Sequence, residues 1–389
     1  MNLGLELPNI GADMASSRAV AERVATAEIR EPGTSRGRGV VARTVTMKTV
    51  ATQAGVTQAT VSMCLANNPR IPPLTRQRVQ ALADRLGYQR NPYVSALMSI
   101  RRRGLHRRDH PVLALVNGLE AEQGWRQTIS LTVRQMRDGA IERAEQRGYR
   151  AEEFWLHRDG MSAGRFGSML HHRGIQGILL GPLMVGASPP ALPWENFSPV
   201  RLGVPLPSLN ITSVCNDHYF SSLQVARECY RRGYHRPGLL LLREHRQHFH
   251  ARWDGGLLVG RHLMPKLRQS RTLLLDDWDH LEPVAAWLEK EKPDVIVSPG
   301  SDVLAAHLQK LGLRLPRDIG LASLALPERQ HACSGVWQNG RLLGATAVDA
   351  IIGMLERNER GLPEQTRVIM LEGVWNEGRT LRAPVRDPA

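Results

Sequence analysis

Short apolar runs alternate with amphipathic segments from Pro111 onwards, and this alternation restricts the fold more than any other feature of the chain. The runs with the length and composition of buried strands are Val112–Val116, Ile175–Leu180, Val200–Val204, Ile211–Val214, Leu239–Leu242, Thr272–Leu275, Val295–Ser298 and Ile319–Leu324. Amphipathic helices are expected over Ser130–Arg147, Ser221–Arg232, Leu281–Lys290, Ser301–Leu311 and Leu342–Arg357. Strands that alternate with helices form parallel sheets covered on both faces. Residues 111–382 therefore predict an α/β core of two doubly wound parallel-sheet subdomains.

Composition excludes several classes of protein. The longest apolar run, Gly177–Gly186, is far shorter than the roughly 20 residues of a membrane-spanning helix, so no membrane association is expected. Met1–Ile10 lacks the basic start and apolar stretch of a signal peptide. The four cysteines form no C-x-x-C motif, which excludes a disulfide scaffold and a cysteine-based zinc site. These features predict a cytoplasmic protein.

Positive charge is concentrated in one short segment. The chain carries a net charge of +14, and residues 45–110 hold eleven Lys and Arg against two Asp. Such a segment is typical of a domain that binds a polyanion, and nucleic acid is the commonest polyanion. The alternative is a solvated basic linker. Residues 1–44 have a nearly balanced charge and a Gly-rich stretch, and are expected to be a disordered extension.

Two helical segments flank Gly55, which supplies the left-handed residue of a tight turn. Thr46 and Thr57 are the expected N-caps, and the third helix is expected over Thr75–Leu86. The expected buried positions are Met47, Val50, Ala51, Ala54, Val61, Leu65, Val79, Leu82 and Leu86. The second helix would direct Gln58, Ala59, Ser62 and Met63 outwards. A short capped helix with this outer face suits the major groove of DNA, where Thr60 and Ser62 would bond phosphates.

The order of residues in this region is more specific than a helix-turn-helix alone. V-T-M-K-T-V-A-x-x-A-G-V-T-x-A-T-V-S is followed by N-N-P-R-I, T-R-x-R-V and L-G-Y-x-x-N-P. This series resembles the headpiece of the LacI/GalR family of bacterial transcription regulators. The resemblance implies a small all-α headpiece over residues 45–90. It also implies DNA contacts from Thr46, Thr57, Gln58, Ala59, Thr60, Ser62, Met63, Arg70, Tyr88, Asn91 and Leu97.

A hinge helix and basic linker are expected over residues 91–110. Asn91 can cap this helix, and Pro92 suits its first turn. A helix of about nine residues is too short to be stable alone in water, so its formation can be coupled to DNA. The resemblance implies that Leu97 inserts between base pairs from the minor groove. The alternative for Leu97 is packing between two hinges.

Two departures from the family pattern alter the expected DNA contacts. Met63 replaces a charged or polar residue, which favours an apolar contact with a thymine methyl group. Arg90 replaces a proline, and five further arginines follow the hinge within residues 101–108. Strong phosphate attraction is therefore expected.

The resemblance extends over nearly all of residues 45–382. The segments that carry it in the core include Asn216-Asp217, residues 293–296, Ser301-Asp302, residues 312–319 and residues 338–355. It implies a periplasmic-binding-protein-like core over residues 111–382, which binds an effector and forms a dimer, and a tail over residues 383–389. The chain is expected to cross between subdomains near Thr212, Ala332 and Pro363. An effector would bind in the cleft at the carboxyl ends of the strands.

Four residues are the expected effector contacts. Arg252 matches a family arginine that binds effector oxygens, and Asp302 matches an aspartate at the edge of the cleft. For both residues the alternative is a structural salt bridge. Trp253 and Trp125 are the two tryptophans expected near the cleft. Ala325 stands where many members place an acid, which makes binding of a sugar through that carboxylate doubtful.

The sequence carries no catalytic or cofactor motif. No G-x-G-x-x-G, phosphate-binding loop or G-x-S-x-G elbow opens any helix, so we expect no enzyme activity and no cofactor. His245, His248 and His250 lack the spacing of a helical zinc pair, and no metal site is expected.

These observations predict a DNA-binding transcription repressor in the bacterial nucleoid. It would act on a double-stranded operator as a homodimer, under control of an effector of the sugar, sugar acid or nucleobase type. One alternative is a constitutive, weakly specific nucleoid-type DNA binder whose core has lost its ligand. Another is a small-molecule-binding protein or enzyme with a vestigial headpiece.

Overall fold

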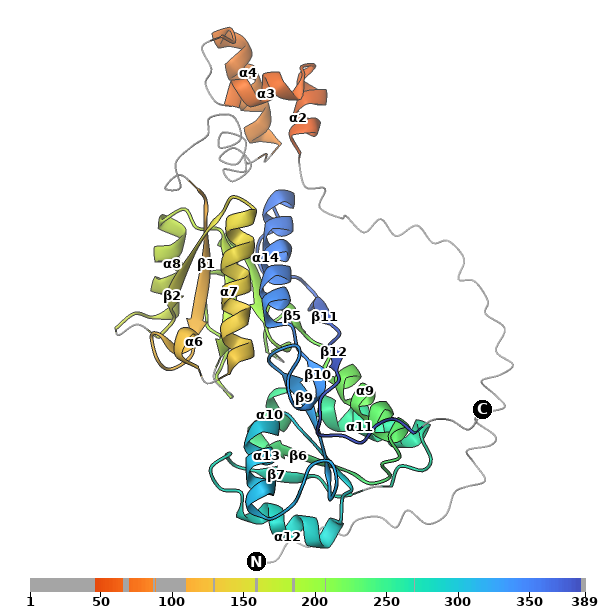
Figure 1. The fold of residues 1–389 in the computed structure, drawn as a ribbon. Helices are drawn as coiled ribbons and strands as arrows, with labels where there is room; N and C mark the ends of the chain where they lie inside the picture. Colours follow the sequence, from red (N-terminus) through yellow and green to blue (C-terminus); the bar gives the residue numbers. More distant parts are fainter. Residues whose placement is uncertain are drawn as a thin grey trace, which may run out of the picture. The chain divides into compact units, whose positions relative to one another are not determined.

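The computed structural model describes residues 46–65, 70–86, 88, 110–128, 130–157, 160–183, 186–206, 208–268 and 270–385. They belong to two compact units that divide between Tyr88 and Gln89 (Figure 1). The expected N-terminal extension, the hinge with Asn91 and Leu97, and residues 386–389 of the tail lie outside the described residues.

In its described residues, the first unit contains the helices α2 (Met47–Ala54), α3 (Gln58–Leu65) and α4 (Pro73–Arg85). Its core is formed by Val50, Ala51, Val61, Cys64, Val79 and Ala83, which are almost fully buried. Met47, Ala54, Leu65 and Leu86 pack against this core but remain half-buried. The small side chains of Cys64 and Ala83 are therefore more deeply buried than the leucines expected in the core.

The first core subdomain contains a six-stranded sheet with the order β11-β5-β4-β3-β1-β2. Its strands are β1 (Val112–Gly118), β2 (Arg150–Trp155), β3 (Gly177–Leu183), β4 (Ser198–Leu202), β5 (Thr212–Asn216) and β11 (Val368–Leu371). Its helices are α6 (Gly124–Gln127), α7 (Leu131–Gln146), α8 (Ala163–His172) and α14 (Gly340–Arg357), with a 3₁₀ turn at Trp194–Asn196. All of these strands pair in parallel.

The second core subdomain contains a sheet with the order β12-β10-β9-β8-β6-β7. Its strands are β6 (Pro237–Leu242), β7 (Leu273–Leu275), β8 (Val295–Ser298), β9 (Gly320–Leu326), β10 (Ser334–Trp337) and β12 (Val374–Asn376). Its helices are α9 (His218–Arg231), α10 (Arg243–His248), α11 (Arg252–Leu263), α12 (Glu282–Glu291) and α13 (Ser301–Lys310). Only β12 is antiparallel to its neighbour.

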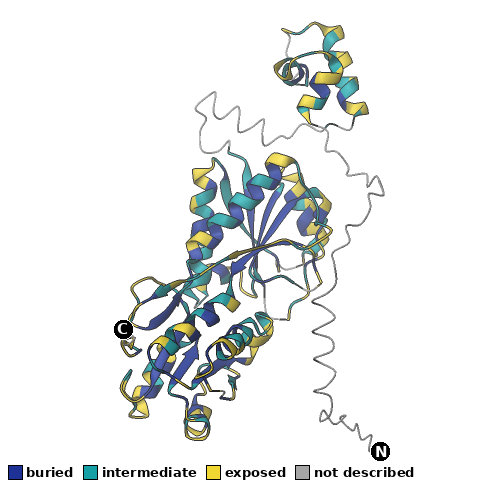
Figure 2. Cartoon of the chain, turned by 90° about the vertical axis from the view of Figure 1, so that its right-hand side faces the viewer, coloured by how far each residue is buried: buried dark blue, intermediate teal, exposed yellow. Residues whose placement is uncertain are grey.

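Each sheet has a separate apolar core on each of its faces. In the first subdomain α7 and α14 lie side by side against one face (Figure 1), with Leu115, Val200 and Ile351 in that core. The opposite face carries a second core that includes Phe166 of α8 and Leu180. Figure 2 shows that the central strands are buried and that the outer faces of the helices are exposed, whereas β2 is half-buried and β11 is largely exposed. The expected class of two doubly wound parallel-sheet subdomains is confirmed.

The chain passes between the subdomains at three places, each later than expected. It leaves the first sheet after β5 and enters α9 at His218, rather than near Thr212. It returns between β10 and α14, after Trp337 rather than near Ala332. It leaves again between β11 and β12, after Leu371 rather than near Pro363. In all three cases a strand completes its pairing before the chain crosses.

Candidate nucleic-acid interface and ligand site

The N-terminus of α3 is fixed by its cap. The Thr57 hydroxyl accepts a hydrogen bond from the Thr60 amide at 3.1 Å and lies 2.9 Å from the Thr60 hydroxyl. Gln58 and Ala59, in the first turn, are exposed, whereas Ser62 and Met63 are half-buried. The capped N-terminal end of α3 therefore presents Gln58 and Ala59 to solvent.

The remaining helices fix the position of α3. Thr46 and Thr49 form a reciprocal capping box at the start of α2, and Gly55 takes a left-handed φ of 67° at the turn. From α4, Arg78 donates to the Ala54 carbonyl at 3.2 Å and Gln80 donates to the Cys64 carbonyl at 2.8 Å. These bonds satisfy carbonyls at the C-terminal ends of α2 and α3, so the turn geometry does not depend on Gly55 alone.

The other predicted contacts of this unit differ in their exposure. Arg70 and Thr46 are exposed, and Tyr88 is half-buried against the helical core. The Thr60 hydroxyl is engaged in the cap of α3. Tyr88 and Thr60 thus have clear structural roles in addition to the expected contact with DNA.

Arg252 lies where the two subdomains meet, at the first position of α11. It follows Ala251, which has a φ of 51°, and its guanidinium reaches the edge strand of the first sheet. There Nη1 lies 3.6 Å from the sulfur of Met370, and this is the only hydrogen bond of the Arg252 side chain among the described residues. A thioether is a weak acceptor, so most of the hydrogen-bonding capacity of Arg252 is unused.

Trp253, the next residue, belongs to a buried aromatic cluster. Its ring centroid lies 5.1 Å from that of His218 and 4.6 Å from that of Phe249, and His245 lies 6.1 Å away. Burial lowers the pKa of His218 to about 3 and the pKa values of His245 and His248 to about 4. These imidazoles are therefore neutral at pH 7. The Trp253 Nε1 group is buried without a hydrogen-bond partner among the described residues.

Trp125 must be removed from the expected effector contacts. It is fully buried in the core of the first subdomain, where Nε1 donates to the Val133 carbonyl at 3.0 Å. Its ring lies so close to Gly181 that a Cβ there would be 2.7 Å away. Trp125 therefore fills the space beneath a helix and offers no surface to a ligand.

Asp302 lies at the surface of the second subdomain, beside a histidine. The Asp302 carboxylate is 71% exposed in the first turn of α13, and lies 3.4 Å from Nε2 of His331. Such an exposed pair contributes little to stability. Within the described part of the chain no group of His, Cys, Asp and Glu has the arrangement of a metal site.

The sequence analysis missed Arg201, in β4. Its side chain is 1% exposed, and Nε and Nη1 have no hydrogen-bond partner among the described residues. It also missed Cys215 and His218, which lie near Arg201 and Arg252. A single charged residue in an otherwise apolar strand was the available signal, because arginine is almost never fully buried without a partner.

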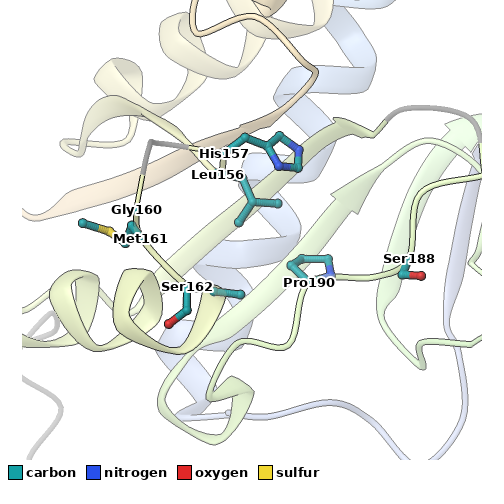
Figure 3. A pocket seen from close by; sticks show the side chains of 8 residues that line it. Leu156, His157, Gly160, Met161, Ser162, Ser188 and Pro190 are labelled. Carbon is teal, nitrogen blue, oxygen red and sulfur yellow. The ribbon is translucent and has the colours of Figure 1, made fainter.

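A separate pocket of about 560 Å³ opens on the first subdomain (Figure 3). Leu156, His157 and Met161, which follow β2, line one side, and Ser188 and Pro190, which follow β3, line another. His157 bonds the Gly118 carbonyl through Nε2 at 3.2 Å. None of the predicted effector contacts lines this pocket.

Comparison with known protein families identifies the helical unit. Residues 46–91 match the family model described as "Bacterial regulatory proteins, lacI family". No curated protein matches the chain. None of the helices in the described residues has the length and apolar character needed to cross a membrane.

Solved structures of transcription regulators share the fold. A complex of the regulator CelR with cellobiose has a TM-score of 0.53 at 18% identity, over 86% of this chain and 99% of that chain. The lac repressor dimer bound to operator and an anti-inducer has a TM-score of 0.51 at 16% identity, over 87% and 99%. CcpA of Lactococcus lactis has a TM-score of 0.53 at 14% identity, over 70% and 100%. The helical unit thus matches the lacI family of bacterial regulatory proteins, and the core has the fold of these solved regulators.

Proposed function

We propose that the chain is a repressor that binds a double-stranded DNA operator as a homodimer and is controlled by a small-molecule effector bound between the core subdomains. The observation that carries the DNA-binding part is the capped N-terminus of α3, which exposes Gln58 and Ala59. Helices of this kind enter the major groove with their N-terminal residues against base edges. One headpiece reads half of a pseudo-palindromic site, so two chains are needed.

The headpiece residues divide into two roles. Gln58, Ala59 and Met63 read bases, with the Met63 side chain against a thymine methyl group. Thr60, Ser62 and Arg70 contact phosphates, which position the helix but carry no sequence information. Thr46, Thr57, Tyr88, Asn91 and Leu97 are assigned to the interface by the family resemblance.

Effector control is proposed to act through Arg252, together with Trp253 and Asp302. Arg252 bridges the two subdomains, because it starts α11 in one and reaches Met370 in the other. A ligand that binds it more tightly in one arrangement of the subdomains shifts the balance between DNA-competent and incompetent states. Arg252→Ala is therefore expected to abolish the effector's influence on operator affinity.

A weakly specific DNA binder is the second candidate. The arginines at positions 101, 102, 103, 107 and 108 add phosphate attraction that does not depend on sequence, and Met63 reduces polar base reading. Such a protein would have no preferred operator.

Selection of sites from random duplex DNA by the full chain separates the two candidates. We expect a pseudo-palindromic consensus from the wild type. Met63→Ala should change the preference at one base pair by about 1 kcal/mol, whereas Arg70→Ala should weaken all sequences alike. Gln77→Ala, at an exposed position of α4, is the control and should leave the consensus unchanged. Absence of any consensus would favour the weakly specific binder.

A further inference from the structure

Two arginines without an acidic partner lie at the junction of the core subdomains. Arg201 is on β4, and Nε and Nη1 of its side chain have no hydrogen-bond partner among the described residues, although the residue is only 1% exposed. The side chain of Arg252, which is half-buried, bonds only the Met370 sulfur among the described residues, so the cost of an unpaired buried charge falls on Arg201. A buried unpaired charge is strongly unfavourable, and buried polar groups without partners are rare in native structures. A group that pairs with both guanidiniums would remove this cost.

Three adjacent strands place these groups on one face of the first sheet. Arg201 on β4 pairs in register with Ser213 on β5, and Cys215, two residues on, pairs with Met370 on β11. Side chains at paired positions and at every second residue share a face. The alternate residues Val200, Leu202 and Val214 belong to the core on the opposite face. Arg252 reaches this row from α11, at Met370.

The neighbouring titratable groups do not neutralise the two arginines. Burial raises the pKa of the Cys215 thiol, so it stays protonated and cannot serve as an anion. Burial, with Arg201 nearby, lowers the pKa of His248 to about 4, and burial with Arg252 nearby lowers that of His218 to about 3. The Asp217 carboxylate lies near Cys215 and accepts the Phe220 amide at 2.8 Å as the cap of α9.

Gly203 lies against the end of the Arg201 side chain. Gly203 has a φ of 118°, and even a Cβ built there would lie 3.6 Å from Nη2 of Arg201. Because Gly203 has no side chain, residue 203 does not cover Nη2 of Arg201. The planar fork of arginine matches the oxygens of carboxylate and phosphate groups.

We propose that Arg201 and Arg252 together bind the anionic group, carboxylate or phosphate, of a small effector at the ends of β4, β5 and β11. The proposal rests on the proposed function, since it names the chemical class of the effector. It accounts for a charged residue inside an apolar strand. It also agrees with Ala325 in place of an acid, because a carboxylate facing the site would repel such a ligand.

Equilibrium dialysis of the full chain against labelled inorganic phosphate tests the site without DNA. Ionic strength is held constant with sodium chloride, and unlabelled D-gluconate, D-glucose 6-phosphate and neutral D-glucose are added as competitors. We expect saturable binding of phosphate, competition by the charged compounds and none by glucose. Displacement by gluconate alone or by the sugar phosphate alone would tell carboxylate from phosphate specificity. Absence of saturable binding would overturn the proposal.

Variants assign the binding to these residues. Arg201→Met and Arg252→Gln should each weaken phosphate binding by about tenfold or more, because a charge-assisted hydrogen bond is lost. Arg271→Met, at an exposed arginine in the second subdomain, should bind as the wild type does. Arg201→Met should also raise the unfolding temperature of the phosphate-free chain, because it removes an unpaired buried charge.

A structural role for Arg201 predicts the opposite pattern. In that case Arg201→Met loses stability, and Arg252→Gln, which gives up only a sulfur contact, binds phosphate with unchanged affinity. That result would reject the anion site even if Arg201→Met fails to fold. Operator binding is measured separately. Phosphate binding by a chain that selects no operator would leave the anion site in place and reject the proposed regulator.

Discussion

Arg201 and Arg232 are both buried, and their surroundings distinguish two uses of a buried arginine. Arg232 is 2% exposed and bonds Glu228 and Glu377, while its guanidinium lies 5.4 Å from the centre of the Trp375 ring. Arg201 has no such partner among the described residues. A satisfied buried charge supports the fold, whereas an unsatisfied one suggests a ligand. The sequence shows an arginine in both places but does not show which one has a partner.

Among the candidate effector contacts, the sequence placed a residue at the subdomain junction where a family motif identified it. Arg252 was found through its family position, and the structure places it at the subdomain junction. Trp125 was expected near the cleft without a motif to place it there, and it fills the core. Burial depends on which helix covers a side chain, and that is a property of the tertiary structure.

His218 makes the stability of the core depend on pH. Its pKa is lowered to about 3 in the folded chain, against an ordinary value of about 6.5 in the unfolded chain. The unfolded chain therefore binds more protons between these values, so stability is full above pH 6.5 and falls as the pH drops towards 3. His218→Phe should reduce the loss of stability between pH 7 and pH 5, as measured by urea unfolding.

An exposed histidine provides the control for this prediction. His262→Gln, on α11, should leave the pH dependence of the wild type unchanged. If His218→Phe shows the same slope as the wild type, the histidine cluster is not the source of the pH dependence.

Helices could be predicted where apolar residues recur at helical spacing. The periodicity of α7, α12, α13 and α14 gave their positions to within two residues. β2 was missed because half-buried Glu152 and Glu153 interrupt its apolar pattern. These carboxylates pair with arginines of neighbouring helices and turns, Glu152 with Arg173 and Glu153 with Arg137. β11 was missed because it is an edge strand with an exposed apolar surface.

The contact between α7 and α14 depends on glycines that the sequence does not identify. A Cβ on Gly344 would lie 1.9 Å from the Met136 carbonyl oxygen and 2.7 Å from the Ala140 amide nitrogen. Both are backbone atoms, so α7 and α14 would have to separate. Gly344→Ala should therefore destabilise the core by about 2–3 kcal/mol, measured by urea unfolding.

Gly353 on the same helix is the matched control. A Cβ there would meet only Nη1 of Arg357, 3.0 Å away at the end of a flexible side chain. Gly353→Ala should be neutral or should stabilise by up to about 1 kcal/mol, because alanine favours helix. Equal losses in both variants would show that helix crossing is not the cause.

The whole molecule is expected to be a dimer even without DNA. Hinge segments must be held side by side to enter one minor groove, and the core is the part large enough to hold them. Two apolar side chains on α11 are available for such contacts. Leu258 is 60% exposed and Leu263 is 58% exposed. Sedimentation of the full chain at micromolar concentration should show a dimer. A monomer would remove the basis for an operator with two half-sites.

The ratio of affinities for a selected operator and for random duplex DNA, at physiological salt, tests the central claim most directly. Reading of bases by α3 predicts an operator affinity at least about 10³ times higher. The salt dependence of both affinities should be steep, because the basic headpiece releases counterions from phosphates. A ratio within a few-fold of one, with the same salt dependence for both DNAs, would contradict sequence-specific regulation and identify the chain as a general DNA binder.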